Sequence, residues 1–223
     1  MNHDNKETCF FFGKKTAPSE KTKDLILEEA KKLFCEKGYE GTSVRDICEA
    51  AGANVSAIKY HFNGKEGLYR ECFIHYGEER LSKTQKILTK SNSSDELKLR
   101  LRLFAEDFIQ EGLANIYVTK MICREIEIQS PLIQDIFQST FLKSYIIITD
   151  CFTDAQAKSF IRKDLNPNVI TGIFFHTLTT SVRMDHIGEK YINRTLKDKN
   201  YIDEIIDNLL TIIFDGIKPQ EQK

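Results

Sequence analysis

Apolar residues recur every three or four positions through most of this chain, which is the spacing of one face of an α-helix. Ser19 is a candidate helix cap, and Gly38 stands where a left-handed residue would end a helix. The pattern therefore predicts a first helix from Ser19 to Lys37. Its apolar stripe comprises Leu25, Ile26, Ala30, Leu33 and Phe34.

Two shorter helical segments follow, joined by a tight turn at Ala51-Gly52-Ala53. Thr42 or Ser43 is expected to cap the first segment and Asn54 the second, because short polar side chains accept bonds from the free N–H groups of a helix start. The buried stripe of the first segment is expected to comprise Val44, Ile47, Cys48 and Ala51.

The second short segment runs from Val55 to Phe62 and separates apolar from polar positions. We expect it to bury Val55, Ile58 and Phe62, which are spaced by three and four residues. Its other faces carry hydrogen-bonding side chains, which are Ser56, Lys59, Tyr60 and His61. A helix anchored on one side and polar on the other is typical of a helix-turn-helix that reads DNA.

The rest of the chain also follows the helical period. Further helices are predicted at about 65–89, 95–112, 114–129, 131–152, 154–163, 166–187 and 201–217, and no strand-like alternation of useful length occurs. The predicted fold is all-α, with nine or ten helices. We expect residues 1–18 to form a flexible arm, 19–66 a three-helix helix-turn-helix domain, 67–218 a larger helical domain and 219–223 a tail.

Composition excludes strong bulk attraction to nucleic acid. The 223 residues carry a formal net charge of −1. Residues 1–66 hold 11 Lys plus Arg against 11 Asp plus Glu. DNA affinity would therefore depend on a few placed donors and not on net charge.

The chain lacks the signatures of several other protein classes. Its six cysteines are widely spaced without a Cys-x-x-Cys pair, and no apolar run approaches the roughly 20 residues of a membrane span. We therefore expect reduced thiols, a cytoplasmic location and no membrane partner. No catalytic motif, cofactor motif or metal-ligand spacing is present, and Met184-Asp185-His186 is interpreted as ordinary surface polarity. We expect no cofactor, no metal and no enzymatic activity.

These features resemble the TetR-type family of bacterial transcriptional repressors. The resemblance runs from Gly38-Tyr39 through Thr42-Ser43 and Ala50-Ala51-Gly52 to His61-Phe62 and Lys65-Glu66-Gly67-Leu68-Tyr69. The run that begins Asn54-Val55 and ends Tyr60-His61-Phe62, together with Arg124-Glu125 and Ser130-Pro131, is similar to a subgroup related to the CecR regulators.

The resemblance implies a homodimer that places two recognition helices in successive major grooves of a palindromic DNA operator. We expect Ser56 and Lys59 to reach base edges, Asn54 to act mainly as a cap, and groups near helix ends to grip phosphate. The matched positions expected to contact DNA are Thr42, Ser43, Asn54, Ser56, Lys59, Tyr60, His61 and Lys65.

The resemblance also implies that the larger domain binds a small-molecule effector and dimerises. Dimerisation is expected through the predicted helices from Val169 to Ile187 and from Tyr201 to Ile217. Polar groups embedded in apolar helices are typical of a small-molecule site. The candidate lining residues are Phe104, Phe108, Tyr117, Met121, Arg124, Phe141, Phe175, His176 and Thr179.

The leading hypothesis is a ligand-responsive repressor that a small molecule releases from its operator. One alternative is a thiol redox switch on the same scaffold, using Cys123 or Cys151. Another is a helical enzyme or small-molecule-binding protein that does not bind DNA.

Overall fold

The computed structural model describes residues 20–216, so the predicted arm at 1–18, the Ser19 cap and the tail at 219–223 lie outside the described residues. Within that range the chain forms ten α-helices, one 3₁₀-helix and no strand, which confirms the all-α prediction. The elements are α1 (Glu20–Gly41), α2 (Val44–Ala51), α3 (Val55–Phe62), α4 (Lys65–Ile87), α5 (Ser94–Ala114), α6 (Ile116–Glu127), η1 (Pro131–Ile133), α7 (Gln134–Ser139), α8 (Phe141–Ala157), α9 (Pro167–Ile192) and α10 (Lys199–Phe214).

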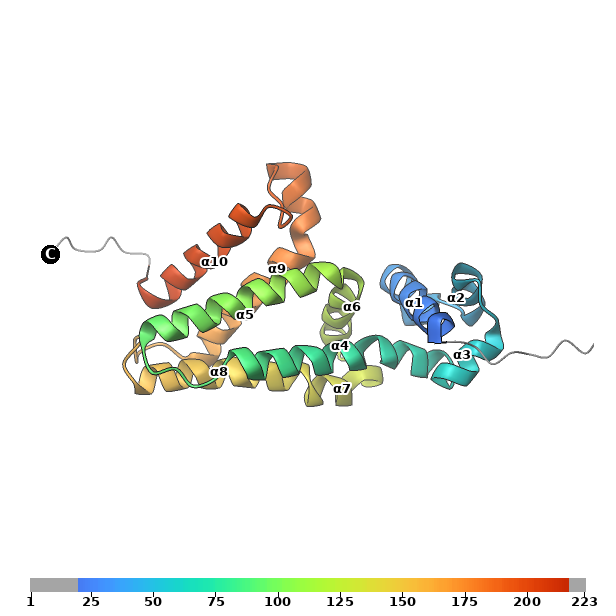
Figure 1. Cartoon of the computed structure of the whole chain (residues 1–223), viewed down its shortest axis with the longest axis horizontal. Helices are drawn as coiled ribbons and strands as arrows, with labels where there is room; N and C mark the ends of the chain where they lie inside the picture. The colour runs from blue at the N-terminus through green and yellow to red at the C-terminus, as the bar shows by residue number, and fades with distance from the viewer. Residues whose placement is uncertain (1–19, 217–223) are drawn as a thin grey trace, which may run out of the picture.

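The molecule is elongated, with a small three-helix unit at one end (Figure 1). Helices α1, α2 and α3 form this unit, and the long helix α4 leads from it under the larger domain. Helices α8, α9 and α5 pack successively on one another, and α10 packs along α5. Helix α6 stands between the two parts and packs on α1.

Local signals in the sequence account for the boundaries of the three-helix unit. Gly38 has φ 77° and interrupts the helical backbone of α1 near its end. Gly52 and Asn63 adopt left-handed conformations that end α2 and α3, with φ 60° and 59°. Such conformations strain most residues with a Cβ, but they are accessible to Gly and to Asn.

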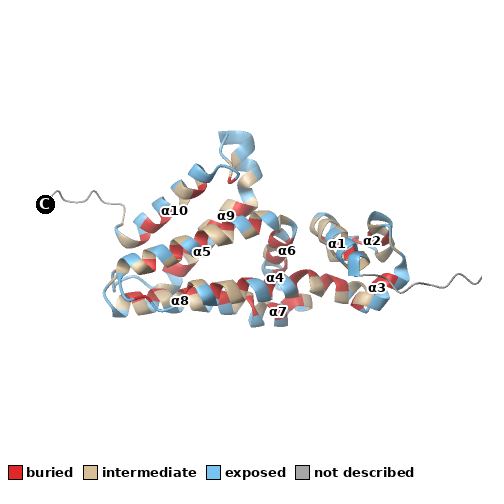
Figure 2. Ribbon diagram, in the orientation of Figure 1, coloured by how far each residue is buried: buried red, intermediate tan, exposed pale blue. Residues whose placement is uncertain are grey.

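The core of the amino-terminal end continues past the predicted domain boundary at residue 66. It begins with Ile26 and Phe34 of α1 and includes Tyr69 on α4 and Met121 on α6, all fully buried. The rings of Phe34 and Tyr69 meet edge to face with centroids 4.8 Å apart. Figure 2 shows buried positions along α4 on both sides of this junction. Helix α4 therefore belongs to the cores of both parts.

A second core lies in the larger domain between α5, α8, α9 and α10. Three rings form its aromatic centre. The centroid of the Phe174 ring lies 6.0 Å from that of Phe104 and 6.0 Å from that of Phe152. The stripe predicted on the last helix is buried here, because Ile206 and Leu209 face α5. This core fixes the helices that surround the cavity described below.

The single helix predicted over 131–152 is wrong: this stretch forms η1, α7 and the first part of α8. The break falls at Thr140, whose hydroxyl donates to the carbonyl of Ile136 over 2.6 Å. Thr side chains that bond to their own backbone compete with the helical ladder. Gly77 packs against this break so closely that an added Cβ would lie 2.7 Å from the Thr140 hydroxyl.

The short helix predicted over 154–163 is also wrong, since α8 continues to Ala157 and the chain then turns. Ser159 adopts a left-handed conformation with φ 60°. The Gln156 side chain donates to the carbonyls of Arg162 and Leu165, which satisfies the backbone of this irregular turn. Between residues 20 and 216, no helix is both long and apolar enough to cross a membrane.

Candidate nucleic-acid interface and ligand cavity

Helix α3 presents a polar face away from the amino-terminal core. Its buried side comprises Ala57, Ile58 and Phe62. Lys59 and Tyr60 point outward, and Tyr60 is 68 % exposed. Lys59 makes no ion pair within the described part of the chain, so its ammonium group is free to bind a ligand. This is the separation of faces that a groove-reading helix requires.

Val55 does not take the buried position predicted for it. It is the first residue of α3 and is 53 % exposed, whereas Ala57 fills the core position. The reason is the short helix start: the cap at Asn54 turns the first residue outward and brings Ala57 beneath the helix. Val55 therefore adds an exposed apolar side chain beside Ser56.

Asn54 caps α3, as predicted. Its side-chain oxygen accepts a 3.0 Å hydrogen bond from the backbone N–H of Ala57. The Ser56 hydroxyl donates to the same oxygen. Asn54 is thus occupied by its own helix, while the exposed Ser56 hydroxyl retains its acceptor capacity.

Thr42 is not available to contact DNA, which corrects its assignment to the interface. It is 1 % exposed, and its hydroxyl lies 2.8 Å from the carbonyl oxygen of Gly38 and 3.1 Å from that of Leu33. The hydroxyl is the donor in both contacts, beside the interruption of α1 at Gly38. Thr42 is a structural residue of the bend between α1 and α2.

Ser43 is exposed at the start of α2 and forms a capping box with Asp46. The Asp46 N–H donates to the Ser43 hydroxyl over 3.1 Å, and the Ser43 N–H donates to the Asp46 carboxylate over 3.2 Å. The hydrogen bonds from the backbone and side chain of Ser43 lower the pKa of Asp46. Ser43 lies at the solvent-exposed start of α2. The backbone N–H groups of a helix start can bind a phosphate.

The remaining predicted contacts lie at the end of α3 and the start of α4. His61 is half-buried, and its Nε2 atom is buried without a hydrogen-bond partner. Lys65 is held over the ring of Tyr39, with its Nζ atom 4.2 Å from the centroid. The sequence reasoning missed Arg45, which is exposed on α2 and makes no ion pair within residues 20–216. Its only sequence signal was a basic residue in the first turn of the helix before α3.

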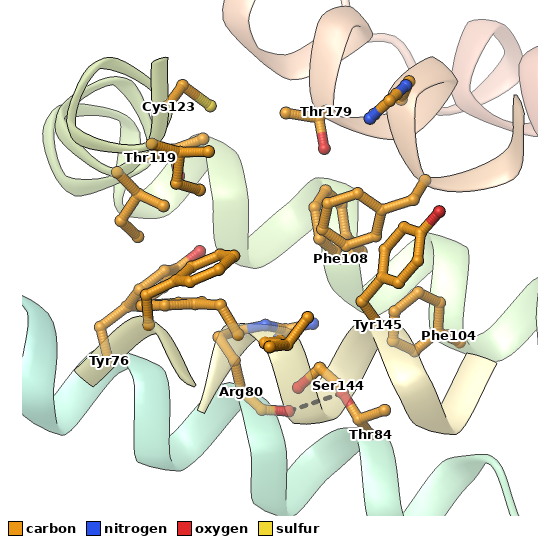
Figure 3. Close-up of a pocket in the computed structure, with 17 residues that line it drawn as sticks. Tyr76, Arg80, Thr84, Phe104, Phe108, Thr119, Cys123, Ser144, Tyr145 and Thr179 are labelled. Atoms are coloured by element: carbon orange, nitrogen blue, oxygen red, sulfur yellow. Dashed lines mark hydrogen bonds between the residues drawn. The ribbon is translucent and has the colours of Figure 1, made fainter. Parts of the chain in front are cut away.

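The larger domain contains a cavity of about 330 Å³ between α4, α5, α6, α8 and α9 (Figure 3). Six of the nine predicted lining residues surround it, namely Phe104, Phe108, Phe141, Phe175, His176 and Thr179. Further aromatic lining comes from Tyr76, Phe137 and Tyr145. His176 is exposed and lies at the rim, where it also borders a groove between α9 and α10.

Tyr117, Met121 and Arg124 do not line the cavity, which corrects their assignment to it. All three lie on α6, whose cavity side carries Thr119, Cys123 and other residues. Met121 is buried in the amino-terminal core and Tyr117 is 39 % exposed. Sequence spacing placed them on an apolar helix but did not determine which neighbour each face meets.

Arg124 joins the two parts of the molecule. Its guanidinium donates to the carbonyls of Phe34 and Cys35 on α1, over 2.8 and 3.1 Å. It also lies 3.5 Å from the buried carboxylate of Glu125. Arg124 therefore ties α6 to the helix that supports α2 and α3.

The sequence reasoning missed Arg80, the charged residue of the cavity. The apolar stripe of α4 continues from Tyr76 to Arg80, so a charged residue on a buried stripe was the signal that could have found it. The Arg80 side chain is 7 % exposed and forms an ion pair with Asp107. In Figure 3 it rises from α4 toward the centre of the lining residues, with Thr179 on the opposite wall.

None of the five cysteines within residues 20–216 has the lowered pKa of a redox-active thiol. Burial raises the pKa of Cys123, and it raises that of Cys151 to about 11. Reactive cysteines need the opposite shift, because the thiolate is the nucleophile. Cys35, Cys48 and Cys72 also have pKa values raised by burial.

No group of three His, Cys, Asp or Glu side chains within residues 20–216 is arranged to hold a metal ion. Asp185 accepts from the N–H of Leu196 over 2.6 Å and from the Thr195 hydroxyl over 3.1 Å. These two hydrogen bonds hold the loop after α9 against the helix.

Helix α9 also carries an exposed apolar stripe. Val169, Ile173, Met184, Ile187 and Tyr191 are each more than a third exposed and follow spacings that place them on one face. On α10 most apolar residues are buried within the domain, and Ile212 is 48 % exposed.

Comparison with known proteins places this geometry in a family. Residues 26–72 match the family model for bacterial regulatory proteins of the tetR family. The chain is 34 % identical over 126 residues to the probable HTH-type transcriptional regulator YttP of Bacillus subtilis (strain 168), a match that spans 56 % of this chain and 60 % of YttP. It is 25 % identical over 223 residues to the HTH-type transcriptional regulator RutR of Escherichia coli O157:H7, covering 93 % of this chain and 96 % of RutR.

Among solved structures, the TetR family transcriptional regulator PfmR from Thermus thermophilus has a TM-score of 0.70 and 22 % identity, over 88 % of this chain and 97 % of PfmR. At that identity the likeness shows the fold, which extends through the cavity-bearing domain. The matched segment 26–72 contains α2, α3 and the first turns of α4. These comparisons support a regulator of the TetR family, whose family segment this chain carries at residues 26–72.

Proposed function

We propose that this protein is a ligand-responsive DNA-binding transcriptional regulator, acting as a repressor that a small molecule releases from a palindromic operator. The observation that carries the proposal is the outward face of α3, with Lys59 and Tyr60 exposed opposite a fully anchored side. Chromosomal DNA as partner makes the cytoplasm the expected location.

Two kinds of DNA contact are assigned to this surface. Ser56 and Lys59 lie on the exposed face of α3 and are the candidates for base edges, since Lys donates to guanine N7 and O6. Ser43, Tyr60 and Lys65 lie near helix ends and are assigned to phosphate, together with Arg45. His61 is placed beside Tyr60, with ring centroids 5.0 Å apart, and supports its orientation.

We propose that the homodimer forms mainly through α9. Its exposed apolar residues form two groups on one face, Val169 and Ile173 near the start of the helix and Met184, Ile187 and Tyr191 near its end. A second copy packed on this stripe would remove it from water, and a two-fold interface repeats the same surface on both subunits. Helix α10 contributes less, because its main stripe is buried against α5.

The cavity is assigned to the effector. Its volume falls within the range of small-molecule sites in proteins, and its lining is apolar with few polar groups. Helix α6 borders the cavity with Ile122 and Cys123 and contacts α1 through Arg124. A ligand that favours one position of α6 therefore changes the separation of the two α3 helices through differential affinity for two states.

The finer assignment to the CecR-like subgroup is also a proposal. The two dipeptides that suggest it, Arg124-Glu125 and Ser130-Pro131, flank one turn, in which the Ser130 N–H donates to the Glu125 carbonyl over 2.9 Å. This turn directly follows Arg124, which contacts α1. The two dipeptides therefore lie where α6 meets the three-helix unit. The thiol switch is not favoured because of the raised thiol pKa values, and an enzyme is not proposed because the family consists of DNA-binding regulators.

The test is an electrophoretic shift with the purified protein and the DNA upstream of its own gene. We expect retention that is selective for sequence over a shuffled competitor and that falls steeply with salt concentration. Lack of selective retention at this DNA and at neighbouring promoters would overturn the proposed function.

A further inference from the structure

The walls of the cavity are made mainly of aromatic rings. Seven of its lining residues are Phe or Tyr. Phe175 meets Phe108 and Tyr145 edge to face, with ring centroids 5.3 and 5.8 Å apart. Ring faces and edges arranged in this way favour a flat aromatic body, which stacks on some rings and meets the edges of others.

Most polar groups in these walls are already satisfied by the protein. The hydroxyls of Thr84, Thr119 and Ser144 donate to the backbone carbonyls of Arg80, Gly112 and Thr140. The Thr84 bond is drawn in Figure 3. Because these hydroxyls already donate to the backbone, they do not require a hydrogen-bond acceptor from a ligand.

Two buried polar atoms in the cavity walls lack any partner. They are Nη2 of Arg80 and Oγ1 of Thr179. Arg80 projects from α4 and Thr179 from α9, on opposite sides of the cavity in Figure 3. A buried donor without a partner is costly, and the cost is greatest for a charged group.

The Arg80 guanidinium is held in place before any ligand arrives. Its Nη1 atom bonds to Asp107, whose carboxylate also lies 3.3 Å from Nζ of Lys83. Its central carbon lies 5.7 Å from the centroid of the Phe108 ring. One edge of the guanidinium is therefore used by the protein and Nη2 remains, already oriented, for a further acceptor.

We propose that the effector is an aromatic molecule with one hydrogen-bond acceptor head, a carboxylate or a carbonyl, which Arg80 Nη2 and Thr179 Oγ1 bind. This inference rests on the proposed function, and it names the chemical class of the ligand in the same cavity. Arg can only donate, so a cationic or donor-only head would leave Nη2 unsatisfied. A carboxylate offers two oxygens, so that one can accept from Arg80 and the other from the Thr179 hydroxyl on the opposite wall.

The experiment uses three probes that share one shape and differ in the head. They are 2-naphthoate, 2-acetylnaphthalene and 2-isopropylnaphthalene, which carry a carboxylate, a neutral carbonyl and a hydrocarbon. Binding to the full-length protein without DNA is measured by calorimetry and by thermal stabilisation. We expect the two oxygen-bearing probes to bind at least about 10-fold more tightly than the hydrocarbon. Tighter binding of the carboxylate than of the ketone identifies an acid as the natural class, and equal binding identifies a neutral acceptor.

Thr179→Val is the principal variant, because Oγ1 has no partner to lose and Val preserves the shape. We expect it to weaken the binding of the two oxygen-bearing probes by about 3- to 10-fold and to leave the affinity for the hydrocarbon probe unchanged. Thr153→Val is the matched control, since Thr153 is exposed on α8 and does not line the cavity. The double variant Arg80→Met/Asp107→Asn removes the pair without leaving a buried charge, and should abolish the preference for oxygen.

Absence of binding by both oxygen-bearing probes, or equal affinity for all three, overturns the inference. So does an unchanged preference in Thr179→Val and in the double variant. Because no DNA is present, these results are independent of the operator shift. Selective DNA binding without this ligand preference would reject the ligand class alone, and the reverse result would reject the regulatory function.

Discussion

The Arg124 guanidinium on α6 donates a 2.8 Å hydrogen bond to the carbonyl oxygen of Phe34 on α1. The bond joins residues 90 positions apart in the sequence and crosses from the larger domain to the three-helix unit. A second bond reaches the Cys35 carbonyl. Both acceptors lie in the last full turns of α1 before the interruption at Gly38.

Arg124→Met should uncouple effector binding from DNA release while leaving each activity measurable. The substitution keeps the apolar stem and removes both hydrogen bonds to α1, which costs about 1–3 kcal/mol of folding free energy. We expect operator affinity without effector within a few-fold of wild type, and a smaller loss of affinity when effector is added. The measurement is an operator titration with and without effector. Arg162→Met, which removes an exposed ion pair to Asp164 away from α6, is the control. A full effector response in Arg124→Met would contradict the assignment.

Lys59→Ala should weaken operator binding with an intact fold. Lys59 is exposed and makes no ion pair within residues 20–216, so its loss removes the proposed DNA contacts and breaks no ion pair of the fold. We expect a loss of about 1–3 kcal/mol in binding and relaxed selectivity at one base pair. Lys86→Ala, an exposed lysine on α4, is the matched control for net charge. Unchanged affinity in Lys59→Ala would remove this residue from the base-reading set.

Thr42→Val should reduce stability and not DNA recognition. The variant keeps the shape but loses the hydroxyl bonds to Gly38 and Leu33, at a cost of about 1–3 kcal/mol in the free energy of unfolding. Urea unfolding measures the loss, and an operator titration under native conditions is expected to change by less than about 2-fold. If affinity fell sharply with stability unchanged, Thr42 would be a DNA contact after all.

Ile173→Glu should produce a monomer that no longer retains the operator. Ile173 lies in the exposed stripe of α9 and is 50 % exposed in the single chain, so a charge there leaves the fold intact but is buried unpaired in a dimer. Ile146→Glu is a close control, because Ile146 is 47 % exposed on α8 away from the stripe. Light scattering after size exclusion gives the mass of each. A dimeric Ile173→Glu variant would place the interface elsewhere.

Alkylation should be slow at Cys151, and the regulator should respond to its effector without this thiol. A pKa of about 11 leaves Cys151 protonated at pH 8, so iodoacetamide should react roughly 100-fold more slowly than with an unfolded thiol. The rate should rise with pH until the thiol ionises. Mass spectrometry follows the labelling. Loss of the effector response in Cys151→Ala, which does not line the cavity, would instead revive the redox alternative.

Local patterns were sufficient to predict the helix-turn-helix. The capping residues Ser43 and Asn54, the turn at Gly52 and the limits of α3 depend on interactions within a few residues, so the sequence contains them directly. The same period predicted most helices of the larger domain. It missed the break at Thr140 because that bend depends on the close packing of Gly77 against it.

The sequence by itself determined the all-α fold, the recognition helix with its polar face, and the aromatic character of the effector domain. Only the tertiary structure decided which side chains share a site. Thr42 turned inward to the bend at Gly38, Arg124 faced α1, and Arg80 entered the cavity. The physical reason is that helical periodicity assigns a residue to a face, whereas the partner of that face is set by long-range packing between helices.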